Sequence, residues 1–346
     1  MRQKLTPLLS NLLSLTKPRI VALLCLTGVS GVLAAGGTSL VVLVAFVVAG
    51  AGMAGGAASL NCYYDRNLDK KMARTRDRPL PSGEFPAWVS VILGVSLLGL
   101  STLIGGVFLN ASSVMYMWLG MVSYVGLYTV VLKRRHWLGV VLGGSAGSFP
   151  VLAGWSVVKP ISVSAVLMAA LVFCWTPAHA WAFAYVYRKD FESAGIPTLP
   201  VVAGKDRVQR SIWYSAVLTV LVAGAVTPFT GLVYTGVFLA SSPLFLLAFY
   251  QYKRSGHPSV AVRAFFTSNT FLAVLFGSWG IDGLLGHPNS LISLVPALVV
   301  PLIFIQVWKA QPGLRGISGA IGEEWKLVLE TAHNYWKKNP IQGRSK

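Results

Sequence analysis

The chain has 346 residues, of which 54% are hydrophobic and only 12% charged, and its formal net charge is +18. Soluble domains carry about twice that share of charged residues, so the composition excludes an ordinary soluble protein and predicts a membrane protein. The cations fall almost entirely between apolar segments, where they are typical of topology signals and lipid headgroup contacts. We therefore expect the lipid bilayer, and no nucleic acid, as a partner.

The chain begins with polar residues mixed among leucines over residues 1–19. This pattern predicts a cytosolic lead-in along the membrane interface, and not a leader peptide that is removed. Apolar segments that could span a bilayer follow near residues 20–37, 39–60, 87–108, 113–132, 138–157, 162–186, 211–233, 236–251, 262–284 and 290–308. We divide the chain into the lead-in, an intramembrane domain at 20–286, and an additional transmembrane helix with a basic cytosolic tail at 287–346.

The distribution of lysine and arginine predicts how the chain is oriented. With the N-terminus in the cytosol, Lys159 is the only one of these cations expected on the opposite side. The positive-inside rule therefore predicts a multi-pass protein of the cell (inner) membrane with a cytosolic N-terminus. Two loops with acidic motifs, 61–86 and 186–210, then face the cytosol.

The first of these loops begins with a regular series of polar residues. Asn61, Asp65 and Asp69 recur every four residues, so they lie on one face of a helix, whereas Asn67 falls on another face. Because the preceding segment is apolar, this face is expected at the partially negative C-terminal end of a membrane helix. Two aspartates placed there favour a bound cation, and Mg²⁺ that holds a substrate phosphate fits this need.

A run of cations follows the aspartates in the same loop. Its members suit phosphate oxygens, although cations after a membrane helix also serve as topology signals, and the sequence leaves both roles open for each cation. They are Lys70, Lys71, Arg74, Arg76 and Arg78.

The second acidic loop follows an apolar segment that contains a histidine. Helical spacing predicts one stripe made of Trp175, His179, Phe183, Tyr187 and Asp190. An ionisable residue within a membrane helix is costly and often functional, so we expect the histidine and the aspartate to contact opposite ends of a large ligand assembly. The alternatives are a histidine satisfied by a neighbouring helix and an aspartate that is only a solvated loop charge.

The three cysteines are Cys25, Cys62 and Cys174. They are odd in number, far apart, and within or beside apolar segments. Neither a disulfide framework nor a CxxC metal site is predicted.

These motifs together resemble the UbiA superfamily of intramembrane prenyltransferases. The similarity covers LTKPRI, NCYYDRNLDKKMARTRDRPL, LKRR, GGSAGSFPVLAGW and YRKDFESAGIPTLPVVAG. Within the superfamily, the combination of RTRDRPL, WTPAHAW and AGIPTLPVV resembles enzymes that act on haem and not on quinone precursors. The resemblance implies an all-α bundle of about nine transmembrane helices around a central cavity, here with one helix added at the C-terminal end.

The activity that the resemblance implies is transfer of the farnesyl group of farnesyl diphosphate to the vinyl group of protohaem IX, with Mg²⁺ as cofactor and haem O as product. It implies Asp65, Asp69 and Asp190 as catalytic residues and Mg²⁺ ligands. The expected diphosphate-binding residues are Asn61, Lys70, Arg74, Arg78, Arg188 and Lys189. The expected haem-binding residues are Trp175, His179 and Tyr187.

Other interpretations stay open at this point. A related prenyltransferase acting on an aromatic quinone precursor shares the aspartate motifs, and a membrane transporter would also fit many helices with an intramembrane histidine. The additional C-terminal helix and basic tail leave open an oligomer contact or a membrane-surface anchor. A second copy of the chain, haem A synthase or an oxidase assembly protein stays open as a partner.

Overall fold

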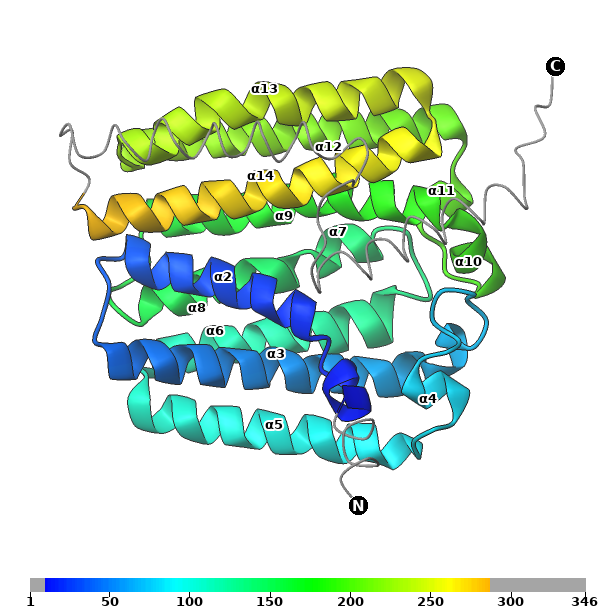
Figure 1. Ribbon diagram of the computed structural model, residues 1–346, viewed down its shortest axis with the longest axis horizontal. Helices are drawn as coiled ribbons and strands as arrows, with labels where there is room; N and C mark the ends of the chain where they lie inside the picture. Colours follow the sequence, from blue (N-terminus) through cyan, green and yellow to red (C-terminus); the bar gives the residue numbers. More distant parts are fainter. Residues whose placement is uncertain (1–9, 287–346) are drawn as a thin grey trace.

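The computed structural model describes residues 10–286, which form an all-α bundle without β-strands in that range (Figure 1). The first half contains α2 Pro18–Ala34, α3 Leu40–Asp69, α4 Pro79–Ser82, α5 Ala87–Phe108, α6 Ala111–Met121, the π-helix η1 Val122–Leu132, α7 Gly139–Gly143 and α8 Ser145–Ser156. The second half contains α9 Val163–Val186, α10 Arg188–Ser193, α11 Leu199–Val202, α12 Lys205–Val226, the 3₁₀ helix η2 Thr227–Phe229, α13 Leu232–Ser255 and α14 Pro258–Leu284.

Within the described residues, 7 helices are long and apolar enough to cross a membrane. They are α3, α5, α6 with η1, α9, α12 with η2, α13 and α14. The predicted count of nine is not confirmed, because α2 has only 17 residues and the expected segment at 138–157 is divided at Gly144 into α7 and α8. The helix expected at 290–308 and the basic tail lie outside the described residues.

The predicted segment boundaries agree best with the helix bounds where the helix ends together with its apolar segment. Helix α5 occupies the predicted range 87–108. Helix α3 continues past the apolar segment to Asp69, and α12 begins at Lys205, before its apolar segment. Long helices thus carry polar residues out of the apolar layer and into the loops at one end of the bundle.

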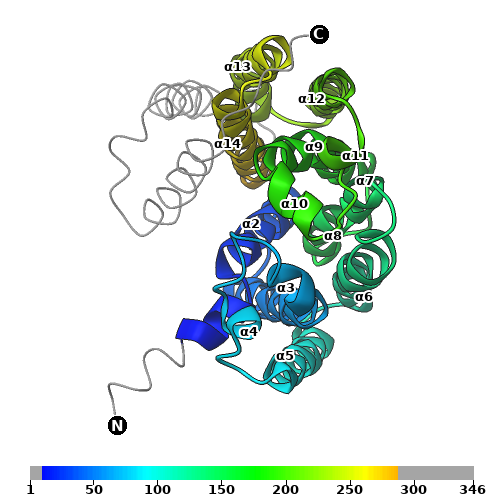
Figure 2. The ribbon, with the colours of Figure 1, turned by 90° about the vertical axis from the view of Figure 1, so that its right-hand side faces the viewer.

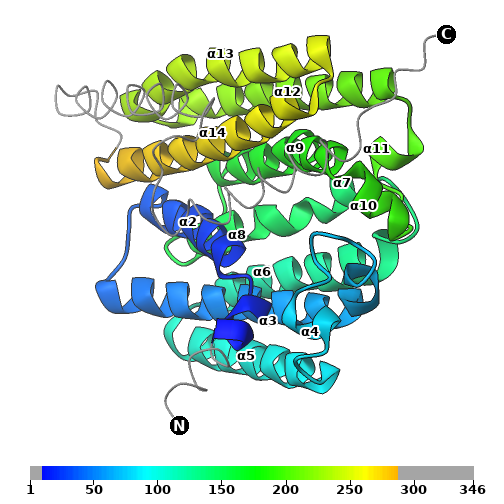
Figure 3. The same ribbon diagram turned by 45° about the vertical axis from the view of Figure 1, so that its right-hand side comes forward.

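The connecting segments with acidic motifs gather at one end of the molecule. Figure 3 shows α4, α10 and α11 together at this end, and in Figure 2, which looks along the long helices, α10 and α4 lie over the helix ends. The two loops touch, since the Ser193 hydroxyl donates to the Lys71 carbonyl at 3.0 Å. Apolar side chains beneath them form a small core of Leu68, Met72, Ala194 and Ile196. The two loops therefore lie at the same end of the bundle (Figure 3).

Glycines allow α2 to pack closely against α8. A Cβ atom on Gly154 would lie 1.9 Å from the Gly28 carbonyl oxygen, and one on Gly31 would lie 2.7 Å from the Val151 carbonyl oxygen. No side chain fits at either position without moving backbone. This contact fixes the shorter helix α2 against the bundle and thereby places Lys17, which directly precedes it.

A buried aspartate joins α14 to the beginning of α13. Asp282 is fully buried, and its carboxylate accepts hydrogen bonds from the backbone amides of Gly231 at 2.8 Å, Val233 at 3.2 Å and Tyr234 at 2.9 Å. The N-terminal amides of a helix have no intrahelical acceptor and favour a negative charge. Asp282 therefore stabilises the fold far from the acidic loops.

We expect Asp282→Ala to lower the thermal unfolding midpoint of the detergent-solubilised protein. Each buried donor left without an acceptor costs about 1–3 kcal/mol, and three amides lose theirs. The matched control is Asp77→Ala, because the Asp77 side chain is 88% exposed. Equal midpoints for the two variants would show that the Asp282 contacts contribute nothing to stability.

Candidate functional site

The last two turns of α3 carry the polar face that the sequence predicts. Asn61, Asp65 and Asp69 are buried with 3%, 3% and 6% of their surface exposed, whereas Asn67 is exposed. The Asn61 side-chain amide donates to Asp65 Oδ2 at 2.8 Å. The prediction that the three residues share one helix face, with Asn67 on another, is confirmed.

Cations from other segments reach both aspartates. Lys133 Nζ lies 2.5 Å from Asp65 Oδ2, and Arg78 Nη1 lies 3.5 Å from Asp69 Oδ2. Burial opposes the charge of Lys133, but Tyr128 and the Asp65 carboxylate outweigh it and raise the lysine pKa, so the ammonium group stays protonated. The site thus holds buried carboxylates beside cations, and the Arg78 side chain is 42% exposed.

Arg74 is positioned for an anionic ligand. Its guanidinium group lies over the rings of Phe183 and Tyr187, at 5.3 Å and 5.5 Å from their centroids, and its Nε atom is buried without a hydrogen-bond partner. Burial, followed by repulsion from Arg78, lowers the pKa of Arg74. A negatively charged group bound here would relieve both costs.

Asp190 reaches the same region from the second loop. It is 8% exposed and accepts a hydrogen bond from the Arg74 backbone amide at 3.3 Å. The predicted continuous stripe is wrong beyond Val186, because α9 ends there, Tyr187 leaves helical geometry, and Asp190 lies on the separate helix α10. The chain bends at Tyr187, where α9 does not continue. Asp190 is instead held by its hydrogen bond to the backbone of the first loop.

The remaining predicted site residues differ from the carboxylates and from one another in how far they are buried. Lys70, Arg188 and Lys189 are exposed, so they lie at the edge of the site and not among the buried carboxylates. Tyr187 is buried, and burial raises its pKa to about 12 although Arg74 opposes the shift. Its hydroxyl therefore keeps its proton.

The buried atoms fit Mg²⁺ held jointly with a ligand. Asp65 Oδ1 is buried without a hydrogen-bond partner, and Asp69 shares its helix face. Among residues 10–286, no three histidine, cysteine or carboxylate side chains are grouped closely enough to hold a metal by themselves. Mg²⁺ commonly uses one or two carboxylates together with substrate phosphates, so this donor set suits Mg²⁺ only when phosphate oxygens complete it.

Lys17 is a member of the site that sequence reasoning missed. Its ammonium group donates to Asn61 Oδ1 at 2.5 Å and to the Tyr124 hydroxyl at 3.1 Å. Lys17 is the only non-glycine residue with positive φ among residues 10–286, at 53°. The costly left-handed conformation, directly before Pro18, turns this side chain toward α3. The LTKPRI stretch is part of the family resemblance, but the sequence does not predict the direction of the lysine side chain.

The π-helix η1 supplies two further residues that the sequence analysis did not identify. Thr129 Oγ accepts from the Asn61 amide at 2.9 Å and donates to the Tyr124 carbonyl at 2.8 Å. The backbone amide of Lys133 bonds the carbonyl of Tyr128, five residues earlier, at 2.8 Å. This wider spacing is characteristic of π-helices, which frequently occur at functional sites, and it turns Tyr124 and Thr129 toward Lys17 and Asn61.

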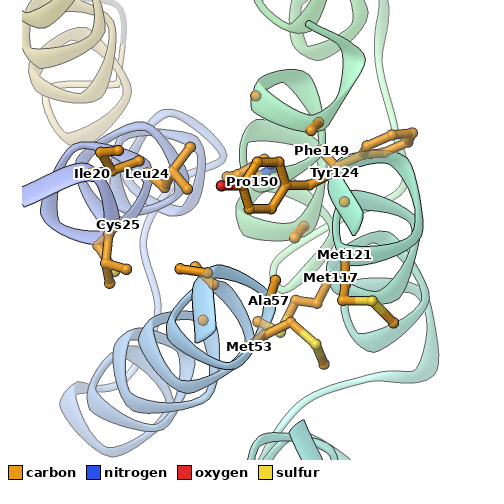
Figure 4. Close-up of a pocket in the computed structure, with 18 of the residues that line it drawn as sticks. Ile20, Leu24, Cys25, Met53, Ala57, Met117, Met121, Tyr124, Phe149 and Pro150 are labelled. Atoms are coloured by element: carbon orange, nitrogen blue, oxygen red, sulfur yellow. The ribbon is translucent and has the colours of Figure 1, made fainter. Parts of the chain in front are cut away.

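An apolar cavity of about 260 Å³ opens beside these polar residues (Figure 4). It lies between α2, α3, α6 with η1, and α8, and it includes Ile20, Leu24, Met53, Ala57, Met117, Met121, Phe149 and Pro150. Lys17 and Tyr124 also line it. Lys17 contacts both Asn61 and Tyr124, so one end of the cavity lies beside the carboxylate site. The rest of the cavity lining is mainly apolar.

The residues expected to bind haem lie away from the apolar cavity, on and after α9. The rings of Trp175 and His179 are 4.1 Å apart, and the His179 ring lies 4.3 Å from Phe265 of α14. Neither Trp175 nor His179 lines the apolar cavity. The structure connects His179 to the loops through aromatic neighbours, because Phe183 lies 5.4 Å from Phe265 and 4.7 Å from Tyr187.

Comparison with known proteins gives consistent matches over most of the chain. The model of the UbiA prenyltransferase family matches residues 21–274. Protoheme IX farnesyltransferase of Mycolicibacterium paratuberculosis is 38% identical over 283 residues, which cover 80% of this chain and 92% of that protein. The protein of that name from Rhodococcus jostii is 35% identical over 292 residues, covering 79% of this chain and 93% of that one. A Roseiflexus protein of the same name is 36% identical, and the match spans only 52% of its length.

Solved structures show the same fold at low sequence identity. A digeranylgeranylglyceryl phosphate synthase has a TM-score of 0.66 at 15% identity, with 80% of this chain and 98% of that chain covered. A UbiA homologue from Archaeoglobus fulgidus, bound to DMAPP and Mg²⁺, has a TM-score of 0.60 at 19% identity, with 78% and 98% covered.

Proposed function

The chain belongs to the UbiA prenyltransferase family, and on that premise we propose that it transfers the farnesyl group of farnesyl diphosphate to a vinyl group of protohaem IX, giving haem O. The Mycolicibacterium and Rhodococcus relatives named for this activity match it at 38% and 35% identity over 92% and 93% of their own lengths, and the match to the Roseiflexus relative spans 52% of its length. This favours the haem substrate over the quinone-precursor and transporter alternatives.

One structural observation carries the proposal. Buried carboxylates with cations beside them lie at one end of an apolar cavity between membrane helices. Farnesyl diphosphate has the same two parts, a charged head and a hydrocarbon tail. We assign the head to the region of Asn61, Asp65, Asp69, Arg74, Arg78 and Asp190, with Lys17 and Lys133 as additional contacts, and the tail to the cavity.

Each part of this arrangement contributes to the reaction. The bond between farnesyl C1 and oxygen breaks, its electron pair leaves with diphosphate, and the vinyl carbon attacks C1. Water then adds to the resulting haem cation and releases a proton, which leaves a hydroxyethyl group. Arg74, Arg78 and the two lysines stabilise the charge of the departing diphosphate. Asp65 and Asp69 would hold Mg²⁺, which would supply further positive charge beside the diphosphate.

The same proposal assigns the acceptor side and the topology. We propose that protohaem contacts Trp175, His179 and Tyr187. Positive charge at the exposed edge of the site comes from Lys70, Arg188 and Lys189. We propose that α2 and the pair α7–α8 complete nine membrane passes in a catalytic unit of residues 20–286. The acidic loops face the cytosol, because the positive-inside rule leaves only Lys159 on the other side.

The test of the activity is product analysis with two acceptors in competition. Purified protein receives farnesyl diphosphate, Mg²⁺, protohaem and 4-hydroxybenzoate, and the products are analysed by mass. We expect farnesylated, hydrated haem and unmodified 4-hydroxybenzoate. Farnesylation of 4-hydroxybenzoate in place of haem would contradict the proposal.

A substitution in the cavity tests the assignment of the farnesyl tail. Ala57 is 3% exposed and lines the cavity (Figure 4), so Ala57→Phe fills space that the tail needs. Overpacking costs roughly 1–3 kcal/mol, and we expect the KM for farnesyl diphosphate to rise about tenfold while haem affinity is kept. Val48→Phe is the control, because Val48 lies on the same helix and is 48% exposed. Equal kinetics for the two variants would place the tail elsewhere.

A further inference from the structure

His179 is enclosed between two aromatic rings where α9 meets α14. The Trp175 ring lies 4.1 Å away at an interplanar angle of 22°, and the Phe265 ring lies 4.3 Å away at 25°. Both faces of the imidazole are therefore covered by stacked rings. Any further interaction must use the edge of the ring, where its two nitrogen atoms lie.

The hydrogen bonds of Ser268 determine which nitrogen carries the proton. His179 Nδ1 lies 2.8 Å from Ser268 Oγ, and the same hydroxyl lies 2.7 Å from the Phe265 carbonyl oxygen. A serine hydroxyl has one proton, and a carbonyl oxygen can only accept. Both contacts are hydrogen bonds only when the hydroxyl donates to Phe265 and accepts from a protonated Nδ1. In the neutral ring, the Nε2 atom then has the free lone pair.

Ser268 also fixes the orientation of the ring. It is fully buried, and its backbone carbonyl accepts from Trp175 Nε1 at 3.1 Å. Trp175 and His179, one helical turn apart on α9, thus both donate to this one residue of α14. Within residues 10–286, no hydrogen-bond partner is found for His179 Nε2, so the lone pair is available to a ligand.

We propose that Ser268 is a positioning residue that holds His179 as the Nδ1–H tautomer, so that Nε2 is the axial ligand to the iron of protohaem. This inference rests on the proposed function, which supplies the haem. Neutral imidazole ligates haem iron, and a hydrogen bond from the other ring nitrogen commonly fixes the tautomer and the ring orientation. Ser268 acts through His179 and does not touch the haem itself.

The tautomer is measured first, without haem. Protein labelled with ¹⁵N-histidine is studied by NMR, and the signals of His179 are assigned with a His179→Gln variant among the 5 histidines of the chain. We expect a protonated Nδ1 and an unprotonated Nε2 in the wild type. Ser268→Ala should give a mixture of tautomers, and Ser268→Thr, which keeps a hydroxyl, should restore the single form. A protonated Nε2 in the wild type would overturn the proposal.

Haem titration then tests the ligand role. We expect Ser268→Ala to weaken haem affinity by about 10- to 100-fold, as loss of a hydrogen bond behind a metal ligand commonly does. Ser268→Thr should recover affinity, and His179→Gln should change the Soret spectrum. Ser242→Ala is the matched control, since the Ser242 hydroxyl is buried without a hydrogen-bond partner in the described region.

The outcomes separate this inference from the proposed function. If haem is still farnesylated but His179→Gln leaves the Soret spectrum and haem affinity unchanged, the ligand role is refuted and the proposed activity stands. If the wild-type protein neither binds nor modifies haem, the proposed function fails and the ligand role fails with it. In either case the NMR experiment reports the tautomer of His179 without haem, so its result does not depend on haem binding or activity.

Discussion

Asp65→Asn is expected to reduce haem farnesylation by about 10²-fold or more, the usual loss when one contact to transition-state charge is removed. One oxygen of Asp65 is already held by Asn61 and Lys133, and the other is buried without a partner. The side chain is therefore fixed in position before Mg²⁺ and diphosphate bind. Asparagine keeps the shape of the side chain but removes its charge, which weakens binding of Mg²⁺. Turnover is therefore measured at limiting Mg²⁺, where this loss has its largest effect. Asp69→Asn should behave in the same way.

Two controls separate this loss from misfolding. Asn67→Ala alters an exposed residue of the same helix and should retain nearly full turnover. Lys133→Met removes the other partner of the buried ion pair, and its unfolding midpoint shows how much stability that pair contributes. If Asp65→Asn and Asp69→Asn both turn over like the wild type at limiting Mg²⁺, the metal assignment is wrong.

Arg74→Ala should raise the KM for farnesyl diphosphate by about 10- to 100-fold, since a hydrogen bond to a charged group is worth roughly 1.5–3 kcal/mol. The KM for haem should change less, because the carboxylates that interact with the Arg74 charge are Asp69 and Asp190, which we assign to the diphosphate, and its only contact in the described region with a residue assigned to haem is with the Tyr187 ring. Initial rates are measured with each substrate varied in turn. Arg78→Ala, which also frees Asp69, should show the same selectivity.

Arg76→Ala is the matched control for this loop. The Arg76 side chain is 63% exposed, and its ion pair in the described region is with the exposed Asp77. A cation that serves as a topology signal should leave the kinetics unchanged, as we expect for Arg76. Equal increases in both KM values for Arg74→Ala would indicate a general distortion and would refute the diphosphate contact.

The polar face of α3 could be predicted because it depends on local periodicity. Residues at spacings of four share a helix face wherever the helix continues, and no proline interrupts Leu40–Asp69. The same reasoning was wrong for Tyr187 and Asp190, because the helix ends at Val186 and contacts between the loops decide the path of the chain. Periodicity does not report where such a tertiary contact interrupts a helix.

Lys17 and Thr129 could not be found in this way because long-range geometry places them. Lys17 reaches a residue 44 positions later in the chain through a left-handed turn, and Thr129 is turned toward Asn61 by a π-helix. Neither conformation has a periodic sequence pattern. The predicted count of nine membrane passes is not confirmed for a related reason. The segment expected at 138–157 is continuous in hydropathy but is divided at Gly144 into α7 and α8, and α2 has only 17 residues.

The most direct test of the account is the location of bound farnesyl diphosphate. A farnesyl diphosphate analogue with a photoreactive group on its last isoprene unit is crosslinked to the purified protein with Mg²⁺, and the labelled peptides are identified by mass spectrometry. The account predicts labelling within α3 and α6, at cavity residues such as Met53 and Met117, and loss of labelling when excess farnesyl diphosphate competes. Competed labelling confined to α12 and α13, with the cavity residues unmodified, would contradict it.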